Sequence, residues 1–530
     1  MSYFRTLAQA FLGRPMASLP SSGFFGATNG RRTINIGNTT RGMSNLALAD
    51  GPTLLARARK ADLDNPLARN GITSFVAEVI GTGMRPHSKH PDADKRRNIE
   101  KEFALWVPQS SAVRRVGPGG VPDSLQNFFL QQQLVCRNAV VAGEAFARLR
   151  PRRVSDLSPS GLRVPLQIDL IEPEQLAWWR MSGEMASPEN LVRGGIEFDP
   201  LHQRVAYHFY REHPGDSSLW PNAWEVVRVP AQSVLHVVEF LQGAQIRGVS
   251  ALAPIIVALA DLDDFEDAER FRQKLGAYLF GWKKTLNPDN DPLTATASTT
   301  AGTDQAAAGT AYVESKAGQV TMLDANQNED FGFYAHPGVP NGYEPFVRLQ
   351  KQTVSTILRI TYDMASGDSS KATYSSARIR LIALRRIWEQ FQQAVIVHQF
   401  CRPVWRAWLD AAALVGVIDA ADYRRNPENY LDVEWSGQPW EWVDPVADVQ
   451  SVRMEMESCL TSREAETSRR GRNVEDVDAA IKRDHDRERT MGIVPVFGLS
   501  RVTEVVPPGQ NEDLAGTEPP PPDSPQVKKP

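Results

Sequence analysis

Apolar residues recur every three or four positions through residues 250–282, which is the spacing of one face of an α-helix. The stripe consists of Leu252, Ile255, Leu259, Leu262, Phe265, Ala268, Phe271, Leu275, Tyr278 and Trp282. A helix of this length would extend roughly 45–50 Å at about 1.5 Å per residue, and it would far exceed the mean helix of ~11–12 residues. Ser250 is a suitable N-cap, and Pro254 falls in the opening turn, where proline costs least.

A loosely structured insert and a second helix follow the first. The insert, residues 291–312, is rich in Ala, Thr, Gly and Asp, a composition that predicts little regular structure. The second helix is expected to begin at Pro345, after a start signal in residues 342–345. Its apolar side is Phe346, Leu349, Thr353, Ile357 and Ile360. The chain thus sends out a long helix, forms a loose projection and returns as a second helix. This arrangement suits a protein that lines a tube or bridges two assemblies.

The rest of the chain predicts helices around one sheet module. Helical patterns cover residues 51–83 and 124–143, and segments between 145 and 240 alternate in polarity or carry β-branched and aromatic residues between turn residues. A further helix is expected from about residue 375, with Pro403 kinking or ending it. Charged helices follow over 446–490, one of them capped by Asn473. The predicted fold class is α+β and predominantly helical, with a small antiparallel sheet module.

Composition narrows the class of protein. The chain has 530 residues, of which 42 % are apolar and 23 % charged, as in ordinary globular proteins, and it is too long for one compact core. The three cysteines are far apart in the sequence and form neither a disulfide framework nor a zinc pattern, so we expect a reducing compartment. The longest apolar run, near residues 253–260, is well short of the ~20 residues that span a bilayer. The N-terminus shows no convincing cleavage site. No membrane association is therefore expected.

The formal net charge of −4 bears on nucleic-acid binding. Proteins that clamp DNA by its phosphates are normally basic, because Lys and Arg displace condensed counterions. A slightly acidic chain is poorly suited to be a repressor or a nuclease. It is compatible with a conduit, in which tight phosphate contacts would brake DNA that must slide.

Catalytic motifs are mostly absent. The sequence has no G-x-x-x-x-G-K-[ST] loop and no G-x-S-x-G elbow. Gly81–Thr82–Gly83 is interpreted as a helix C-cap, and His202, His208 and His213 do not fall at the spacing of a ligand set. We therefore expect no catalytic residue, no metal and no cofactor. An enzyme of DNA processing, such as a nuclease or protease, stays as the alternative, since Asp261, Asp263 and Asp264 could in principle bind magnesium.

Several sequence blocks resemble one family. They are RARKADLDNPLARNGITSFVAEVIGTG (57–83), VAGEAFARLR (141–150), QIRGVSALAPIIVALADLDDFEDAE (245–269), TYSSARIRL (373–381) and WEWVDP (440–445). In this order they are similar to the portal proteins of lambda-type tailed phages, with gaps, over about residues 50–480. The resemblance implies a non-enzymatic ring, usually of twelve copies, at one capsid vertex. It also implies a conduit for DNA packaging and ejection, with another head–tail connector protein as a weaker alternative.

The resemblance further implies partners and a location. The expected partners are double-stranded DNA without sequence specificity, the terminase large subunit, the major capsid protein or scaffold, and head–tail connector proteins. The expected location is the virion, at the portal vertex, after assembly in the host cytoplasm.

The resemblance also divides the chain into regions. We expect a flexible segment (1–50), a wing (51–248), a stem helix (249–285), a clip (286–342), a second stem helix (343–362), a tunnel loop (363–373), a long tunnel-side helix returning to the wing (374–445), crown helices (446–505) and a disordered tail (506–530). The tail is proline-rich and acidic, a composition typical of disorder.

Three groups of residues are the candidate sites. The tunnel loop would bring Ser366, Gly367, Asp368, Ser369, Ser370 and Lys371 to the DNA. Basic residues that would line the channel are Lys283, Lys284, Arg348 and Lys351. For Lys283 and Lys284 the alternative is favourable placement at a helix C-terminus, and for Arg348 and Lys351 it is pairing with acidic residues of a neighbouring subunit. The apolar stripe would form the ring interface, with Leu252, Leu259 and Phe265 as its candidate residues.

Overall fold

The structure is a computed structural model that describes residues 42–116, 122–154, 161–177, 190–216, 224–278, 281–284, 330–333, 342–370, 373–440 and 445–492. The N-terminal segment up to residue 41, most of the expected clip, Lys371 and the expected tail lie outside these ranges. The chain divides into two compact units, Met1–Val443 and Asp444–Pro530. The described part is predominantly helical with small antiparallel sheets, as the sequence predicts.

The first unit opens with two helices, α2 (Met43–Asp64) and α3 (Pro66–Val79). The prediction of a loose segment up to residue 50 is therefore wrong from Met43 onward. The helical pattern of residues 51–83 is also divided, because Pro66 disfavours helical backbone at the residue before it. Asn65 instead caps α3, since its side-chain oxygen accepts a hydrogen bond from the Ala68 N–H at 2.8 Å.

The main core lies among helices that come from distant parts of the sequence. It contains α3, α4 (Ala93–Trp106), α5 (Phe128–Val141) and α12 (Arg402–Leu414). Its centre is aromatic: the Phe103 ring lies 5.0 Å from that of Trp405 and 5.1 Å from that of Trp408. Trp435 packs on the same group, as expected of a core residue.

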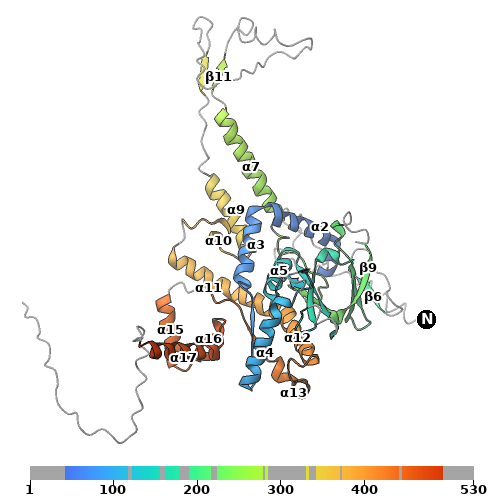
Figure 1. The fold of residues 1–530 in the computed structure, drawn as a ribbon. Coiled ribbons are helices and arrows are strands. Elements are labelled where there is room, and N and C mark those ends of the chain that lie inside the picture. Colours follow the sequence, from blue (N-terminus) through green and yellow to red (C-terminus); the bar gives the residue numbers. More distant parts are fainter. Residues whose placement is uncertain are drawn as a thin grey trace, which may run out of the picture. The chain divides into compact units, whose positions relative to one another are not determined.

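Two antiparallel sheets lie beside these helices (Figure 1). One has the order β10 (Val234–Val238), β4 (Glu144–Pro151), β5 (Leu166–Ile171). The other has the order β6 (Leu191–Arg193), β7 (Ile196–Phe198), β8 (Arg204–Tyr210), β9 (Val226–Pro230). The strand predictions between residues 145 and 240 are confirmed. Side chains alternate across β4, so that Ala145 and Ala147 face the helical core and Phe146 joins a second apolar cluster with Tyr207 and Phe209.

The first unit also contains three further strand pairs and several short helices. The pairs are β1 (Arg85–Ser88) with β13 (Val433–Ser436), β2 (Arg114–Val116) with β3 (Pro122–Ser124), and β11 (Gly281–Lys284) with β12 (Asp330–Phe333). The short helices are η2 (Val107–Gln109), η5 (Pro173–Gln175), η6 (Pro214–Asp216), η7 (Ala231–Ser233), α13 (Ala420–Arg425) and α14 (Pro427–Leu431).

The long helix predicted over residues 250–282 is shorter in the structure. α7 spans Ile256–Tyr278, and turns occupy residues 251–255, where Ser250 accepts a hydrogen bond from the Leu252 N–H at 3.1 Å. Ser250 therefore caps a turn and not the helix. At the other end Gly281 and Trp282 belong to β11, because glycine disfavours helix and aromatic residues favour strands.

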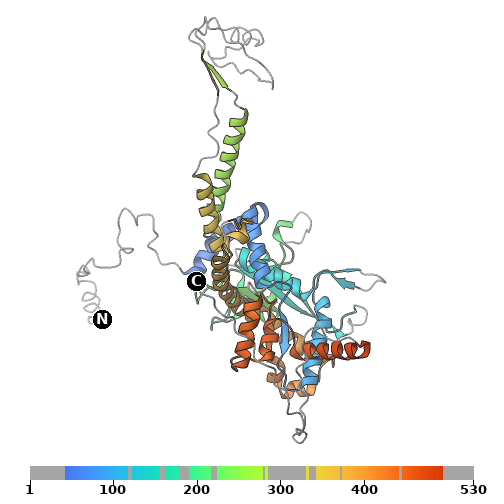
Figure 2. The same cartoon turned by 90° about the vertical axis from the view of Figure 1, so that its left-hand side faces the viewer.

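The returning helix α9 (Tyr343–Ile357) begins beside Gly342, close to the predicted start, and lies alongside α7 (Figure 2). It ends five residues before the expected boundary at residue 362. Arg359 there has a left-handed backbone, with φ 58°. A short helix, α10 (Tyr362–Ser366), follows, so the expectation of a loop throughout residues 363–373 is wrong for its first four residues.

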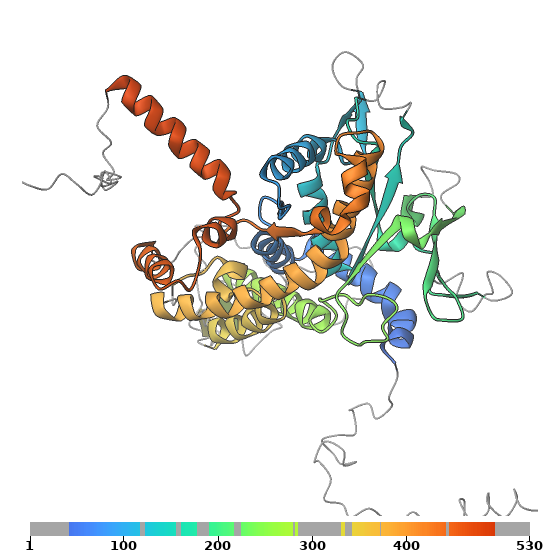
Figure 3. The same ribbon diagram turned by 90° about the horizontal axis from the view of Figure 1, so that it is seen from below.

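The next helix runs on without a loop through three parts (Figure 3). α11 (Tyr374–Phe391) leads into a π-helical segment, η10 (Gln392–Cys401), and then into α12. The sequence predicts that Pro403 kinks or ends this helix, and the structure shows that the helix does not end there. Pro403 falls where π-helical bonding gives way to α-helical bonding, so its missing N–H coincides with a change in the hydrogen-bond ladder.

The second unit contains α15 (Pro445–Glu457), α16 (Arg463–Arg469) and α17 (Val474–Met491). The expected cap of α17 is confirmed, since the Asn473 side-chain oxygen accepts a hydrogen bond from the Glu475 N–H at 2.9 Å. None of the α17 side chains is buried.

Candidate functional site

The α7/α9 pair is held together by aromatic and ionic contacts. The Phe265 ring on α7 lies 5.8 Å from the Tyr343 ring and 5.1 Å from the Phe346 ring on α9. The Lys351 ammonium on α9 lies 2.8 Å from a Glu266 carboxylate oxygen on α7. The two helices therefore form one antiparallel element on the subunit body.

The basic channel candidates do not share one environment. Lys351 is paired within its own chain, so its charge is already balanced by Glu266. The Arg348 guanidinium lies over the Tyr362 ring at 5.0 Å. Lys283 and Lys284 are on β11 and not at a helix C-terminus, so the macrodipole interpretation of these two lysines is wrong.

The loop candidates Ser366 to Ser370 form an ordered turn. Gly367 ends α10 with a left-handed backbone, φ 73°, which glycine adopts without strain. An Asp368 carboxylate oxygen accepts from the Ser370 N–H at 3.0 Å, and the other accepts from the Tyr362 hydroxyl at 3.2 Å. The hydrogen bonds from Ser370 lower the pKa of Asp368 below its ordinary value, with a smaller contribution from the Tyr362 bond. Ser369 lies in the same turn, and Lys371 is outside the described residues.

The turn is fixed to the subunit body through α3. The Asn70 side-chain amide donates to the carbonyls of Met364 and Ala365 at 2.9 and 2.8 Å. At the next position of α3, a side chain at Gly71 would collide with the Leu358 side chain, because a Cβ there would lie 2.5 Å from Leu358 Cδ1. The loop candidates are therefore held on a rigid helix.

A buried ionic cluster anchors the segment that leads into α7. Glu144, at the start of β4, accepts from the Arg247 Nε at 2.9 Å and from the Gly248 N–H at 2.8 Å. Arg247 also donates to the Gly194 carbonyl at 3.0 Å. The Glu144 and Arg247 side chains are 3 and 5 % exposed, so the pair is essentially dry.

His236 completes this cluster as a neutral imidazole. Arg204 can only donate, so its contact of 3.1 Å with His236 Nδ1 makes that nitrogen an acceptor. The proton then lies on Nε2, which is 3.0 Å from a Glu144 carboxylate oxygen. Burial lowers the pKa of His236 to about 4, although the Glu144 carboxylate opposes this shift. Burial raises the pKa of Glu144, but the charges and hydrogen bonds of Arg247 and His236 together outweigh burial, and the pKa lies well below the ordinary value.

Stability should therefore fall as the pH is lowered. Because folding lowers the pKa of His236, the unfolded chain binds more protons than the folded chain between the ordinary histidine value of 6.5 and about 4. The lowered pKa of Glu144 has the same effect at more acidic pH, between its ordinary value of 4.5 and about 2. His236 contributes a slope of up to about 1.4 kcal/mol per pH unit in this window. Urea unfolding at pH 7, 6, 5 and 4 measures it. A His236→Gln variant should lose this part of the slope, and equal slopes in both proteins would contradict the prediction.

Two glycines allow the anchor to form. The backbones of Gly143 and Gly248 touch, since a Cβ on Gly248 would lie 2.2 Å from the Gly143 carbonyl oxygen. A Cβ on Gly143 would meet the Val249 backbone at 2.2 Å, and its φ is 84°. This contact fixes the base of α7 to the end of α5.

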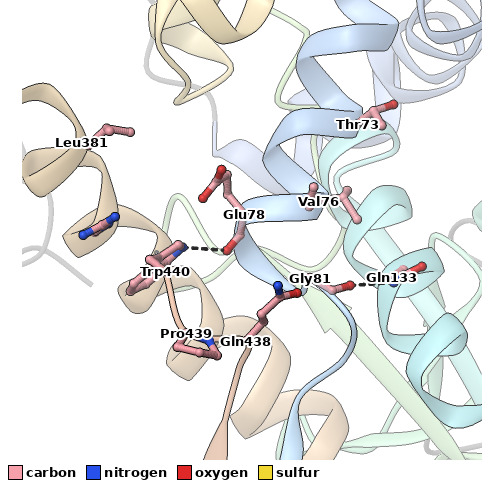
Figure 4. A pocket seen from close by; sticks show the side chains of 11 residues that line it. Thr73, Val76, Glu78, Gly81, Gln133, Leu381, Gln438, Pro439 and Trp440 are labelled. Atoms are coloured by element: carbon pink, nitrogen blue, oxygen red, sulfur yellow. Dashed lines mark hydrogen bonds between the residues drawn. The ribbon is translucent and has the colours of Figure 1, made fainter. Parts of the chain in front are cut away.

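An open polar cleft of about 610 Å³ lies between α3, α5, α11 and residues 438–440 (Figure 4). The Trp440 indole N–H donates to the Glu78 carbonyl at 3.2 Å, and the Gln133 amide donates to the Gly81 carbonyl at 2.7 Å. Burial raises the pKa of the Glu78 carboxyl, and the nearby Arg385 opposes this shift. Trp440 packs on Trp388 at 6.0 Å, as expected of a packing residue.

The ring-interface candidates separate into two groups. Leu252 and Leu259 are buried in the chain's own core, at 0 and 2 % exposure, so they are not available to a neighbour and their assignment is corrected. Phe265 is 40 % exposed although it contacts α9. Further along α7, Phe271 is 67 % exposed. The first half of the stripe, which contains Leu252 and Leu259, therefore faces the core of its own subunit.

The described ranges contain neither a metal-binding cluster nor a helix suited to a bilayer. These ranges hold no group of three His, Cys, Asp or Glu side chains placed to bind a metal. Asp263, one of the acidic candidates, accepts a hydrogen bond from Asn65 at 2.8 Å. Of the described helices, none combines the length and apolar character that crossing a membrane requires.

Sequence reasoning missed the ionic anchor and the exposed isoleucines of α11. Glu144 and Arg247 are separated by 103 positions, so no local pattern connects them. The α11 signal is present in the sequence, because Ile379, Ile382 and Ile387 lie apart from the helically spaced apolar residues Leu381, Leu384 and Trp388.

Sequence comparisons relate the chain to known proteins. Residues 29–392 match the profile of a family described as "Phage portal protein, lambda family". A "Probable portal protein" of Halomonas phage phiHAP-1 is 24 % identical over 503 residues, which is 91 % of each chain. A "Portal protein" of Escherichia phage N15 is 23 % identical over 181 residues, which is 33 % of each chain.

Structural comparisons give weaker likenesses. A chain from the neck of an empty gene transfer agent particle has a TM-score of 0.44 at 12 % identity, covering 80 % of this chain and 94 % of that one. A chain from the virion of a native gene transfer agent particle has a TM-score of 0.42 at 11 % identity, covering 80 % and 93 %.

Proposed function

The chain belongs to the lambda family of phage portal proteins, and from this premise we propose that it assembles into a closed ring of twelve copies at one capsid vertex. DNA passes through the ring during packaging and ejection. The observation that carries this proposal is the family match over residues 29–392. The partly exposed α7/α9 pair supports it, because such a pair has unburied apolar side chains that neighbouring copies can cover.

In this proposal the regions keep the roles that the family resemblance implies. The α7/α9 pair is the stem, the sheets and their helices form the wing, and the three helices of the second unit form the crown. The proposed partners are the terminase large subunit, the capsid protein or scaffold, the head–tail connectors and double-stranded DNA. The proposed location is the virion, after assembly in the host cytoplasm, and the role requires no chemistry of its own.

The turn at Ser366 to Ser370 is proposed to line the narrow part of the channel. Its side chains are small, and one carboxylate repels phosphate, so DNA can pass without being gripped. Contacts to a sliding duplex would be made with phosphates and would be independent of sequence. The bonds that hold the turn on α3 keep it in a fixed place as DNA moves.

Replacing Asp368 and Ser370 by Arg should slow or stall DNA packaging. Two cations at this position would bind phosphates, most strongly at low salt, because the Debye length is about 10 Å at 0.1 M and 3 Å at 1 M. Packaging rates at two salt concentrations measure the effect. An Asp368→Asn variant is the matched control, since it removes the charge and keeps an acceptor for the Ser370 N–H. If the double Arg variant packages at the normal rate at both salt concentrations, the turn does not meet DNA.

Deleting residues 294–309 should leave the rings intact and abolish docking of the packaging motor. These residues lie in the insert between α7 and α9, whose composition predicts little contribution to the core. Light scattering measures ring mass, and pull-down with the terminase large subunit measures docking. Simultaneous loss of rings and docking would contradict the separation of these roles.

A further inference from the structure

The outer side of α11 is apolar and basic. Ile379, Ile382 and Ile387 are 69, 46 and 40 % exposed. Arg380 and Arg386 are exposed on the same stretch of the helix. Isoleucines with this exposure on one short helix form a patch of the kind that marks a protein interface.

The outer side of α7 is apolar and acidic. Val257 and Phe271 are 66 and 67 % exposed, and between them Asp261, Asp264 and Ala268 are also exposed. The positions 257, 261, 264, 268 and 271 are spaced by four, three, four and three residues. They therefore follow one face of the helix.

The charged side chains of these two faces form no ion pairs among the described residues of their own subunit. In the described part of the chain, Asp261, Asp264, Arg380 and Arg386 make no recorded ion pair or hydrogen bond. The inner acids of α7 differ: Glu266 pairs with Lys351, and Glu269 pairs with Arg272.

The two faces do not cover each other within the subunit. The main neighbours of α7 are α2 and α9, whereas α11 packs on α3 and on the π-helical segment η10. Figure 1 shows α7 and α11 leaving the subunit body in different directions. The α7 face can therefore meet an α11 face only on another copy, and such a contact is the head-to-tail arrangement that closes a ring.

We propose that the α11 face of each subunit packs on the outer face of α7 of the next subunit around the ring. The inference rests on the proposed ring assembly and adds to it the pair of surfaces that set the order of the copies. Isoleucines and Phe271 supply the apolar contact, and the two arginines opposite the two aspartates fix orientation and exclude wrong pairings. A second copy is the occupant because each face supplies the charge sign that the other lacks.

Charge reversal with mixing tests this pairing in the full-length protein. The first variant is Asp261→Arg/Asp264→Arg, in which both faces become basic. The second is Arg380→Glu/Arg386→Glu, in which both faces become acidic. All four positions are exposed, so circular dichroism should show that both variants stay folded. Arg406→Glu with Arg425→Glu is a control double reversal at exposed positions of α12 and α13, whose main neighbours include neither α7 nor α11.

Each variant alone should lose rings at 0.1 M salt, with the ring fraction falling at least about tenfold, because like charges face each other at every interface. An equimolar mixture should recover rings, since each face then meets an opposite charge at every contact in an alternating ring. A single chain that carries all four reversals should also form rings. The control reversal should assemble as the wild type does.

Three results would overturn the pairing. Rings formed by both single-face variants would mean that these faces are not in the interface. If the folded variants form no rings either alone or in the mixture, the two faces contact other surfaces. If the second variant forms rings but loses DNA binding, its arginines face DNA. Failure of the wild-type protein to form rings would instead contradict the proposed function, so the two failures are distinguishable.

Discussion

Replacing Arg247 by Met is expected to remove a large part of the stability of the first unit. The substitution leaves the Glu144 carboxylate buried without its guanidinium partner, and breaking such a pair costs about 3–5 kcal/mol. Domains are stable by only about 5–15 kcal/mol in total. The variant should therefore be largely insoluble or should unfold at a much lower urea concentration. Urea unfolding followed by tryptophan fluorescence measures the change.

A matched control is available on the neighbouring strand pair. The Arg150 guanidinium lies 3.0 Å from an Asp169 carboxylate, but the two side chains are 39 and 30 % exposed. Exposed pairs contribute about 0–1 kcal/mol, so Arg150→Met should have little effect. Adding Glu144→Gln to Arg247→Met should restore part of the lost stability, because it removes the buried charge and keeps an acceptor for the Gly248 N–H. Similar stabilities for Arg247→Met and Arg150→Met would contradict the anchor.

Placing a charge on the two halves of the α7 stripe should give opposite results. Leu259→Asp puts a carboxylate into the core of the subunit, where Leu259 is 2 % exposed, and should unfold it at a cost of several kcal/mol. Phe271→Asp changes a side chain that is 67 % exposed. The subunit should stay folded, and the variant should be impaired in ring assembly, because the apolar contact to the next copy is lost.

Thermal unfolding and light scattering of the two variants separate these effects. The expected pattern is no folded Leu259→Asp subunit, and a folded Phe271→Asp subunit with few rings. A Lys274→Ala variant, on an exposed position of the same helix, is the control for general disturbance of α7. If the Phe271→Asp variant forms intact rings, the second half of the stripe is not part of the ring interface. A folded Leu259→Asp ring would contradict the burial of the inner half.

The sequence predicted the elements with strong local signals. The strands β4, β5, β7, β8 and β9 alternate in polarity or carry β-branched and aromatic residues between turn residues. The helices α7, α9 and α17 show helical periodicity, and α9 and α17 also have recognisable starts. Helix ends were less predictable where the tertiary structure decides them. The continuation through Pro403 depends on a π-helical segment, whose bonding pattern has no signal in residue spacing.

The candidate site was only partly accessible from sequence. Periodicity identified the stripe of α7 but could not say which half faces the subunit's own core, because burial depends on the partners α2, α3 and α9. The sequence made Lys351 a candidate channel residue, but it could not show that Lys351 pairs with Glu266 of its own chain. The Glu144–Arg247 anchor joins residues that are distant in sequence, so only the fold brings it into view.

The central claim is that this portal-family chain forms a closed ring. Size-exclusion chromatography with multi-angle light scattering on the purified full-length protein tests it most directly. Twelve copies of the 58.8 kDa chain form a particle of about 700 kDa, and negative-stain images of the same fraction should show rings with a central hole. A single species at the mass of one chain, at micromolar concentration and low salt, would contradict the account.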